Sequence, residues 1–321
     1  MIGNLLIYKN ISPSIIKFID EANDLFSQKP YKLGAKKSRE IFAKHSKSLE
    51  QKRNNDISVV DDFFKYENRE VKIRIYKPNN NVRPSTGMIY IHGGGWIMGD
   101  LDSHDSVCVD LSIDCNVVVI SIDYSLSPEN PYPIALNQCF SLYLQYLNQN
   151  FFFKKLNLKN ILIAGDSAGG NLSAALNLKI KKENLPLPKG LILIYPCLSL
   201  DFNSPSYIKY SNAPILDRKT MIWFWKNYLG KLKNISNPIA IPELEKDLTN
   251  LPDTIICTAE IDPLASDGIK FVKKLKDSSV NVSHIVANNL VHGFIRFREV
   301  GSPSEHYFQL ICKEILRIIN D

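Results

Sequence analysis

Short apolar runs alternate with segments of helical periodicity over most of this chain. Four runs typical of buried strands come before residue 196, at 88–91, 117–122, 160–164 and 191–195. Apolar residues recur with helical spacing after the first three of them, at 104–115, 133–149 and 168–183. The alternation returns after residue 248, with strands at 254–258 and 282–286 and helices at 263–277 and 304–319. Strands and helices in this order form right-handed β-α-β units, so the pattern predicts an α/β fold with a mostly parallel central sheet flanked by helices.

Two further strand-like runs precede this alternating region. They cover residues 59–66 and 70–76, and only the short polar turn Glu67-Asn68-Arg69 separates them. A turn of this length joins neighbouring antiparallel strands, whereas a parallel pair needs a much longer crossover. The pattern therefore predicts an antiparallel hairpin ahead of the parallel strands.

Two segments do not follow the alternation of strands and helices. Residues 1–55 show helical spacing of apolar side chains with a break at Pro30. Residues 197–248 contain four prolines around a single aromatic helix. We interpret both segments as parts of one helical cap. The core of the α/β domain would then consist of residues 56–196 and 249–321.

The composition is that of a globular protein that needs no disulfide or metal to fold. Of the 321 residues, 45% are apolar and 22% are charged, which excludes a disordered or collagen-like chain. The six cysteines form no Cys-x-x-Cys pair, and no histidine cluster has metal-ligand spacing. We find neither a signal-peptide pattern nor an apolar run of about 18 residues, so we expect a cytoplasmic protein without stable membrane insertion.

The net charge of +6 is modest for a chain of this length. Lysines lie in short clusters inside helical patterns, which is typical of a solvated helix face. No long basic run with interleaved aromatic residues is present, so nucleic acid is not an expected partner. The sequence is compatible with a monomer or with a homodimer.

The pentapeptide Gly165-Asp166-Ser167-Ala168-Gly169 lies directly between a predicted strand and a predicted helix. Gly-x-Ser-x-Gly in this context is the pattern of a nucleophile elbow, a sharp turn that lifts the serine hydroxyl clear of the sheet. The simpler interpretation is a glycine-rich turn whose serine caps the helix. Neither a phosphate-binding nor a dinucleotide-binding glycine pattern is present, so no cofactor is expected.

A second glycine-rich segment, His92-Gly93-Gly94-Gly95-Trp96, follows the strand that ends at Ile91. Consecutive glycines let backbone N–H groups point into a cavity with no Cβ in the way. Enzymes that transfer acyl groups need such donors, because each one stabilises the developing oxyanion by roughly 3–4 kcal/mol. His92 could be mistaken for a general base, but its place in this loop favours a supporting role through hydrogen bonding.

A serine nucleophile needs a base, and the base needs a carboxylate to orient it. Asp262 follows the strand at 254–258, and His292 follows the strand at 282–286. Both lie at the carboxyl ends of strands, where open α/β sheets place their sites. The order serine, acid, histidine is also the order found on this type of sheet. Taken alone, Asp262 could equally be the N-cap of the next helix, since Pro263 follows it.

Other acids and histidines compete for these roles. Glu260 and Asp267 are close to Asp262, but Asp267 lies in a helical pattern and Glu260 faces the other way at the strand end. His284 lies within a predicted strand, which is typical of a packed side chain. Three more histidines lie in helix-like segments and receive no role: His45, His104 and His306.

In combination these motifs resemble the hormone-sensitive-lipase-type α/β-hydrolases, a family that includes acetyl esterases, carboxylesterases and arylacetamide deacetylases. The resemblance covers roughly residues 55–321. It rests on four motifs in the family's order: His92–Trp96, Gly165–Gly170, Asp262-Pro263-Leu264 and His292-Gly293-Phe294. Two further stretches, Gly99–Asp105 and Asp123–Glu129, are similar to family segments that follow the glycine loop.

The chain departs from the family at two positions near these motifs. Ser125 stands where many members carry an arginine, so an ion pair common in the family is not expected here. Ala265-Ser266-Asp267-Gly268 replaces the commoner Arg-Asp-Glu-Gly after the aspartate motif. The second change begins three residues after the candidate acid Asp262.

The resemblance implies an α/β-hydrolase fold with a helical cap and a catalytic triad. Ser167 would be the nucleophile, His292 the base and Asp262 the orienting acid. The oxyanion would be bound by the backbone N–H groups of three residues, and two neighbours would shape and support the loop. The three donors are Gly94, Gly95 and Ala168, and the two supporting residues are His92 and Gly93.

These assignments predict a serine esterase that hydrolyses small carboxylic esters with short, acetyl-like acyl chains through an acyl-enzyme, without a cofactor. An amidase or deacetylase acting on aryl amides would use the same triad. A non-catalytic receptor for a small ligand, like the plant gibberellin receptors of this family, would lack the histidine that His292 provides. The aromatic helix around Trp223 could point to a lipase at a membrane interface, although such a stripe is more often the core of a cap.

Overall fold

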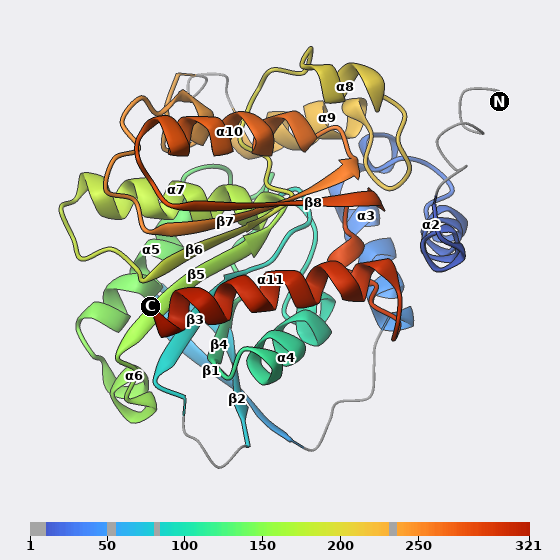
Figure 1. Cartoon of the computed structure of the whole chain (residues 1–321). Helices are drawn as coiled ribbons and strands as arrows, with labels where there is room; N and C mark the ends of the chain where they lie inside the picture. The colour runs from blue at the N-terminus through green and yellow to red at the C-terminus, as the bar shows by residue number, and fades with distance from the viewer. Residues whose placement is uncertain (1–10, 50–55, 80–83, 231–235) are drawn as a thin grey trace.

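The computed structural model describes residues 11–49, 56–79, 84–230 and 236–321. Within these residues, eight strands form one sheet in the order β1-β2-β4-β3-β5-β6-β7-β8 (Figure 1). The strands are β1 Ile57–Tyr66, β2 Arg69–Pro78, β3 Thr86–Ile91, β4 Val118–Ile122, β5 Asn160–Asp166, β6 Gly190–Ile194, β7 Asp253–Ile261 and β8 Val282–Val291. The α-helices are α2 Pro13–Leu25, α3 Pro30–Ser48, α4 Asp105–Asp114, α5 Ile134–Leu147, α6 Phe151–Leu156, α7 Ala168–Lys182, α8 Pro205–Lys209, α9 Arg218–Leu229, α10 Ala265–Asp277 and α11 Pro303–Asn320. Short 3-10 turns are η1 Asp102–His104, η3 Pro242–Leu244 and η4 Phe294–Arg296.

The sheet is antiparallel only at its β1–β2 end. β1 and β2 form a hairpin in which Ile57 pairs with Pro78, and β2 also runs antiparallel to β4. From β4 to β8, neighbouring strands are parallel. The predicted hairpin and the predicted mostly parallel sheet are both confirmed.

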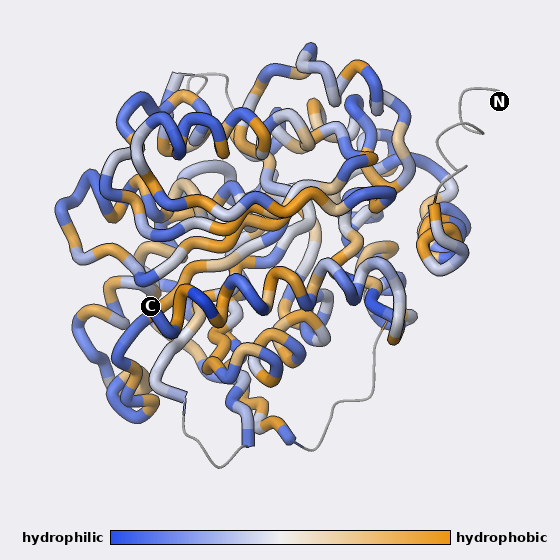
Figure 2. Tube along the Cα trace, viewed as in Figure 1, coloured by the Kyte–Doolittle hydropathy of each residue, from blue (hydrophilic) through white to orange (hydrophobic). Residues whose placement is uncertain are grey.

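Apolar side chains cover both faces of the central strands. β3, β4 and β6 consist entirely of buried residues, as expected for strands between two layers of helices. Because successive side chains alternate between faces, Ile89 and Ile91 belong to one core cluster, and Met88 and Tyr90 belong to the other. Figure 1 shows α5, α7 and α10 over one face and α4 and α11 over the other. The apolar colour of Figure 2 follows the strands between these layers.

The strand order reverses between β3 and β5. The chain places β4 on one side of β3, returns to place β5 on the other, and then continues outward to β8. At such a reversal the loops after the two adjacent strands diverge and leave a crevice. Here these loops are His92–Trp96 after β3 and the turn at Ser167 after β5. The topology therefore brings the two glycine-rich motifs to the same place.

Helices from the two segments outside the alternation lie near the carboxyl ends of the strands (Figure 1). α2 and α3 come from the N-terminal part, whereas α8 and α9 come from residues 197–248. α3 packs against α9 and against η1, and Lys29 Nζ lies 3.7 Å from Asp217 Oδ2. These contacts are what the predicted cap requires, and the division of the chain into cap and core stays a prediction. In the described part of the chain, no helix combines the length and the apolar character needed to cross a membrane.

Gly169→Ala tests how closely α7 packs on β3. A Cβ at residue 169 would lie 1.8 Å from the carbonyl oxygen of Ile91, a backbone atom of a central strand. We expect the variant to lose about 3 kcal/mol of unfolding free energy in urea denaturation, because the overlap forces the helix and strand apart. Gly230→Ala is the control, since its Cβ would meet nothing closer than 3.5 Å. Only the strain of its backbone conformation, with φ of 64° and ψ of −115°, applies there, about 1–2 kcal/mol, so equal losses in both variants would contradict this packing.

Candidate active site

Ser167 lies in a strained turn between β5 and α7. Its φ of 55° and ψ of −117° are unusual for a residue with a side chain. β5 ends at Asp166 and α7 begins at Ala168, so the strand passes into the helix through this single residue. A Cβ on Gly165 would lie 2.5 Å from the carbonyl carbon of Gly169, so the turn has no room for larger residues. This is the geometry of a nucleophile elbow, and it accounts for both glycines of the motif.

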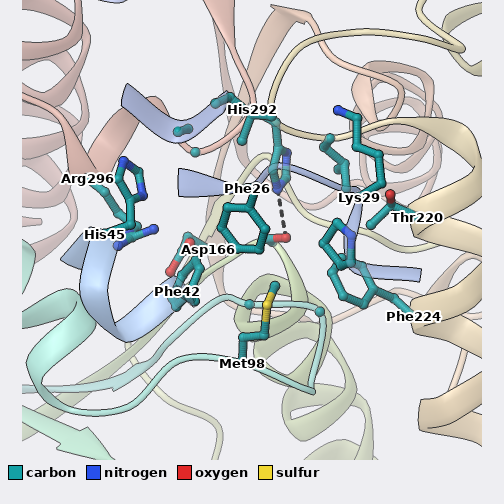
Figure 3. A pocket seen from close by; sticks show the side chains of 18 of the residues that line it. Phe26, Lys29, Phe42, His45, Met98, Asp166, Thr220, Phe224, His292 and Arg296 are labelled. Atoms are coloured by element: carbon teal, nitrogen blue, oxygen red, sulfur yellow. Dashed lines mark hydrogen bonds between the residues drawn. The ribbon is translucent and has the colours of Figure 1, made fainter. Parts of the chain in front are cut away.

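Three side chains from separate loops form a continuous hydrogen-bonded chain. His292 Nε2 lies 2.9 Å from Ser167 Oγ, and His292 Nδ1 lies 2.7 Å from Asp262 Oδ2. Asp262 is fully buried, and its Oδ1 accepts a hydrogen bond from the backbone N–H of Leu264 at 2.9 Å. Figure 3 shows the hydrogen bond of His292 in the middle of the pocket. The arrangement can move a proton from Ser167 to His292 and stabilise the resulting imidazolium.

The contacts of the two competing acids lead away from His292. Glu260 Oε2 accepts a hydrogen bond from the backbone N–H of Asn289 at 2.8 Å. Asp267 is buried in α10, where its Oδ2 accepts hydrogen bonds from two successive backbone N–H groups after β6. Burial raises the pKa of Asp267 well above its usual range. Of the three acids weighed from the sequence, only Asp262 is hydrogen-bonded to the histidine.

The loop after β3 needs its glycines for close contacts. Gly94 and Gly95 have φ of +119° and +63°, and both line the pocket together with Ser167. A Cβ on Gly94 would lie 2.1 Å from the carbonyl oxygen of Met98, and one on Gly95 would lie 2.5 Å from the ring of Phe224. The assignment of the N–H groups of Gly94, Gly95 and Ala168 as oxyanion donors stays a prediction.

His92 contacts the loop and the residues behind it. Its Nδ1 lies 2.8 Å from the carbonyl oxygen of Gly93, and its ring stacks on Tyr124 with the centroids 4.2 Å apart. The Tyr124 hydroxyl also donates to the carbonyl oxygen of His92 at 2.8 Å. Burial lowers the pKa of His92 to about 4, so the ring is neutral at pH 7. These are the contacts that a loop support needs, and none of them involves Ser167.

A buried carboxylate ties the elbow to this loop from behind. Asp166 Oδ1 accepts hydrogen bonds from the N–H of Gly93 at 2.9 Å and from the hydroxyl of Tyr90 at 2.8 Å. His104 Nε2 lies 3.2 Å from the same oxygen. Burial by itself would raise the pKa of Asp166, but the interactions with His104 and the hydrogen bond from Tyr90 outweigh it and lower the pKa to about 2. The ionised carboxylate therefore links the ends of β3 and β5.

The local sequence pattern gives no indication of this contact of His104. The pattern predicts a helix over 104–115, whereas in the structure His104 ends the turn η1 and α4 begins at Asp105. The available signal is the position of His104 inside Gly99–Asp105, a segment that resembles the family's stretch after the glycine loop. Its partner Asp166 is 62 residues away in the chain.

Local hydrogen bonds accommodate both departures from the family's motifs. The backbone N–H and side-chain oxygen of Ser125 each form a 2.8 Å hydrogen bond with the side-chain amide of Gln138. Ser266 exchanges two hydrogen bonds with Ser206 of α8, at 3.0 and 3.1 Å. The first turn after Asp262 is therefore anchored without an acid at position 266.

Ser167 and His292 open into a pocket whose empty space, counting the part that is open to solvent, is about 890 Å³. Its wall is mostly apolar and includes Phe18, Phe26, Phe42, Met98, Leu216 and Phe224. Figure 3 shows His45 and Arg296 on one side of this pocket and Lys29 on the other. The residues that the structure describes contain no cluster of three or more groups that could hold a metal ion.

Several known proteins are similar to this chain over most of its length. Residues 88–296 match the family model described as alpha/beta hydrolase fold. The esterase LipI of Mycobacterium tuberculosis is 30% identical over 295 residues, which are 90% of this chain and 89% of that protein. An ethyl acetate hydrolase of Pseudomonas putida is 26% identical over 246 residues, 76% of this chain and 77% of that protein. The structure of a hyperthermophilic esterase from the archaeon Pyrobaculum calidifontis has a TM-score of 0.88 at 30% identity, covering 96% of this chain and 99% of that one.

Asp166→Asn tests the buried carboxylate through the pH dependence of stability. With a pKa of about 2 in the folded state and 3.8 as the ordinary value, the carboxylate contributes its full stabilisation of the fold above about pH 5. This contribution, on the order of 2 kcal/mol, is lost as the pH falls toward 2, because at first only the unfolded chain takes up the proton. We expect the difference in unfolding free energy between wild type and Asp166→Asn to shrink between pH 5 and pH 3 in urea denaturation. A difference that is constant over this range would contradict the role.

Proposed function

Because the chain belongs to the hormone-sensitive-lipase-type α/β-hydrolases and is a carboxylic ester hydrolase, we propose that Ser167, His292 and Asp262 form its catalytic triad. We further propose that its substrates are small esters with short acyl chains. The observation that carries the first proposal is the hydrogen-bonded chain from Ser167 Oγ through the imidazole to the buried carboxylate, at 2.9 and 2.7 Å. Both distances are those that proton transfer requires.

In the proposed mechanism Ser167 Oγ attacks the carbonyl carbon of the ester while His292 Nε2 takes the hydroxyl proton. Asp262 accepts a hydrogen bond from Nδ1–H, which fixes the tautomer and stabilises the imidazolium. The backbone N–H groups of Gly94, Gly95 and Ala168 stabilise the oxyanion of the tetrahedral intermediate. When the intermediate collapses, His292 gives its proton to the departing alcohol and an acyl-enzyme remains. Water then attacks the acyl group by the same steps, releases the acid and restores Ser167.

The preference for short acyl chains is supported by the wall of the pocket around the nucleophile. The rings of Phe26, Phe42 and Phe224 and the side chain of Met98 are drawn around the Ser167–His292 hydrogen bond in Figure 3. Rigid rings that line the same pocket as the serine restrict a long acyl chain more than they restrict an acetyl group. The relative from Pseudomonas putida is named ethyl acetate hydrolase, and ethyl acetate is such a small ester.

Ser167→Ala should lower ester hydrolysis by a factor on the order of 10⁶, because the members of a triad act as a unit. The rate of hydrolysis of p-nitrophenyl acetate would be compared between the wild type and Ser167→Ala. For the wild type, the rates on the p-nitrophenyl esters of butyrate, octanoate and dodecanoate and on p-nitroacetanilide would also be measured. A serine-directed phosphonate should label Ser167 alone, as read by peptide mass spectrometry. Stoichiometric labelling of a different serine would remove Ser167 from the mechanism, and faster hydrolysis of the dodecanoate than of the acetate would exclude the short-chain preference.

Asp262→Asn should lower kcat by about 10⁴, because an amide at this position favours the wrong imidazole tautomer. Glu260→Gln is the matched control, since it makes the same chemical change two residues earlier, on a side chain whose hydrogen bond goes to Asn289. We expect the control to change kcat less than about 3-fold, because the Glu260 side chain is hydrogen-bonded to the backbone N–H of Asn289 and takes no part in the proposed triad. A larger loss in Glu260→Gln than in Asp262→Asn would transfer the orienting role to Glu260.

A further inference from the structure

A buried arginine lines the active-site pocket without an acidic partner. Arg296 lies in η4, four residues after His292, and only 9% of it is exposed. Its Nε donates to the carbonyl oxygen of Ser103 at 3.2 Å, and its Nη2 donates to Ser46 Oγ at 2.7 Å. The guanidinium lies over the ring of Phe42, 4.2 Å from its centroid. Among the described residues, no carboxylate lies within 4 Å of this guanidinium.

An unpaired buried cation is unfavourable, because it has lost its hydration without gaining a counterion. Burial accordingly lowers the pKa of Arg296, although an arginine stays protonated at neutral pH. Asp166 is one of the acids that act on it from a distance. That carboxylate is already bound by Tyr90, Gly93 and His104 and so is not free to pair with Arg296. The two hydrogen bonds of the guanidinium leave its Nη1 amino group without a partner in the described part of the chain.

His45 of α3 brings a second unused polar group to the same side of the pocket. It is 3% exposed, it lines the pocket, and its Nε2 has no hydrogen-bond partner among the described residues. Burial, followed by the charge of Arg296, lowers the pKa of His45 to about 4. The imidazole is therefore neutral at pH 7 and can donate one N–H. Figure 3 shows His45 and Arg296 together, facing the space beside Phe42 and Phe26.

We propose that Arg296 and His45 bind a carboxylate on the substrate, so that the preferred esters carry an anionic group a few bonds from the scissile carbonyl. This inference rests on the proposed esterase function and names the class of ester. The charged Nη1 amino group of Arg296, which has no partner in the described part of the chain, and an imidazole N–H are both donors that a carboxylate accepts. Lys29, the cation on the opposite side, is 38% exposed and is paired with Asp217, so it lacks these properties.

The carboxylate can be on either half of the ester. A half-ester of a dicarboxylic acid would carry it on the acyl side, and an acyl ester of a hydroxy acid would carry it on the alcohol side. Two pairs of substrates distinguish a carboxylate on the acyl side from one on the alcohol side. p-Nitrophenyl hemiglutarate is compared with p-nitrophenyl valerate, and 4-acetoxybenzoate is compared with 4-acetoxybenzamide.

The experiment measures kcat and KM at pH 7 for both pairs. In the wild type, we expect kcat/KM for the anionic member of one pair to exceed that of its uncharged partner by about 10-fold or more, mainly through KM, as for a buried hydrogen bond to a charged group. The pair that shows this preference identifies the half of the ester that faces Arg296. Equal values within both pairs would overturn the proposal.

Arg296→Gln should lower the ratio of anionic to uncharged kcat/KM by about 10-fold, and His45→Phe should lower it by a smaller factor. A purely structural role of Arg296 would lower both members of a pair by the same factor and leave the ratio unchanged. Arg298→Gln is the matched control. Arg298 is equally buried and two residues further on, but it pairs with Asp110 and does not line the pocket. An unchanged ratio in Arg296→Gln, or an equal fall in Arg298→Gln, would overturn the assignment.

A measurement on the wild type alone keeps the proposal testable if Arg296→Gln does not fold. Glutarate should inhibit hydrolysis of p-nitrophenyl acetate competitively, at a concentration at least about 10-fold below that of glutaramide. Equal inhibition by the two compounds would count against the carboxylate site. Failure of the underlying esterase function looks different, because p-nitrophenyl acetate itself would then not be hydrolysed, or would be hydrolysed equally by Ser167→Ala.

Discussion

The close approach of α7 to β3 is the constraint on which the rest of the site depends. Gly169 lets the helix begin against the backbone of Ile91, and the preceding Asp166 then reaches the N–H of Gly93 at 2.9 Å. These contacts hold the turn of Ser167 beside the glycine loop. Oxyanion donors act at about 2.7–3.1 Å, so a displacement of about 1 Å between β3 and β5 would separate Ser167 from the backbone N–H groups proposed as donors. The two glycine motifs thus work as one unit, although about 70 residues of sequence lie between them.

Three buried carboxylates in this part of the fold have different surroundings, and the surroundings decide what each can do. Asp166 is held ionised by His104 and Tyr90, and it fixes backbone positions. Asp267 accepts hydrogen bonds from two backbone N–H groups, and through them it anchors the chain after β6. Burial raises the pKa of Asp267. Asp262 alone contacts an imidazole that continues to Ser167. Proximity of an acid to the motif in sequence therefore does not separate the three acids, whereas their partners in space do, and these partners support the proposed orienting role of Asp262.

The strands, the hairpin and the elbow could be predicted from the sequence because their signals are local. An apolar run, a short turn or a pair of glycines constrains the backbone within about ten residues. The positions of His45, His104 and Arg296 could not be predicted, since each depends on elements that meet only in the folded chain. The hydrogen bond from Arg296 to Ser46 spans 250 residues. The helical or strand periodicity around Arg296 and around Ser46 does not distinguish a residue with such a contact from an ordinary surface or core residue.

Helix α3 connects the glycine loop to the wall that, in our proposal, would select the substrate. Arg39 in the middle of α3 forms an ion pair with Glu129 and donates to the carbonyl oxygens of Ile97 and Ser127 at 2.7 Å, next to the glycine loop. Near its end, Ser46 accepts the hydrogen bond from Arg296. A helix that moved away from the pocket would have to break both sets of contacts, and one of them involves a buried guanidinium. These contacts hold the side of the pocket formed by α3 against the glycine loop, so the proposed selectivity of this wall would depend on the position of that loop.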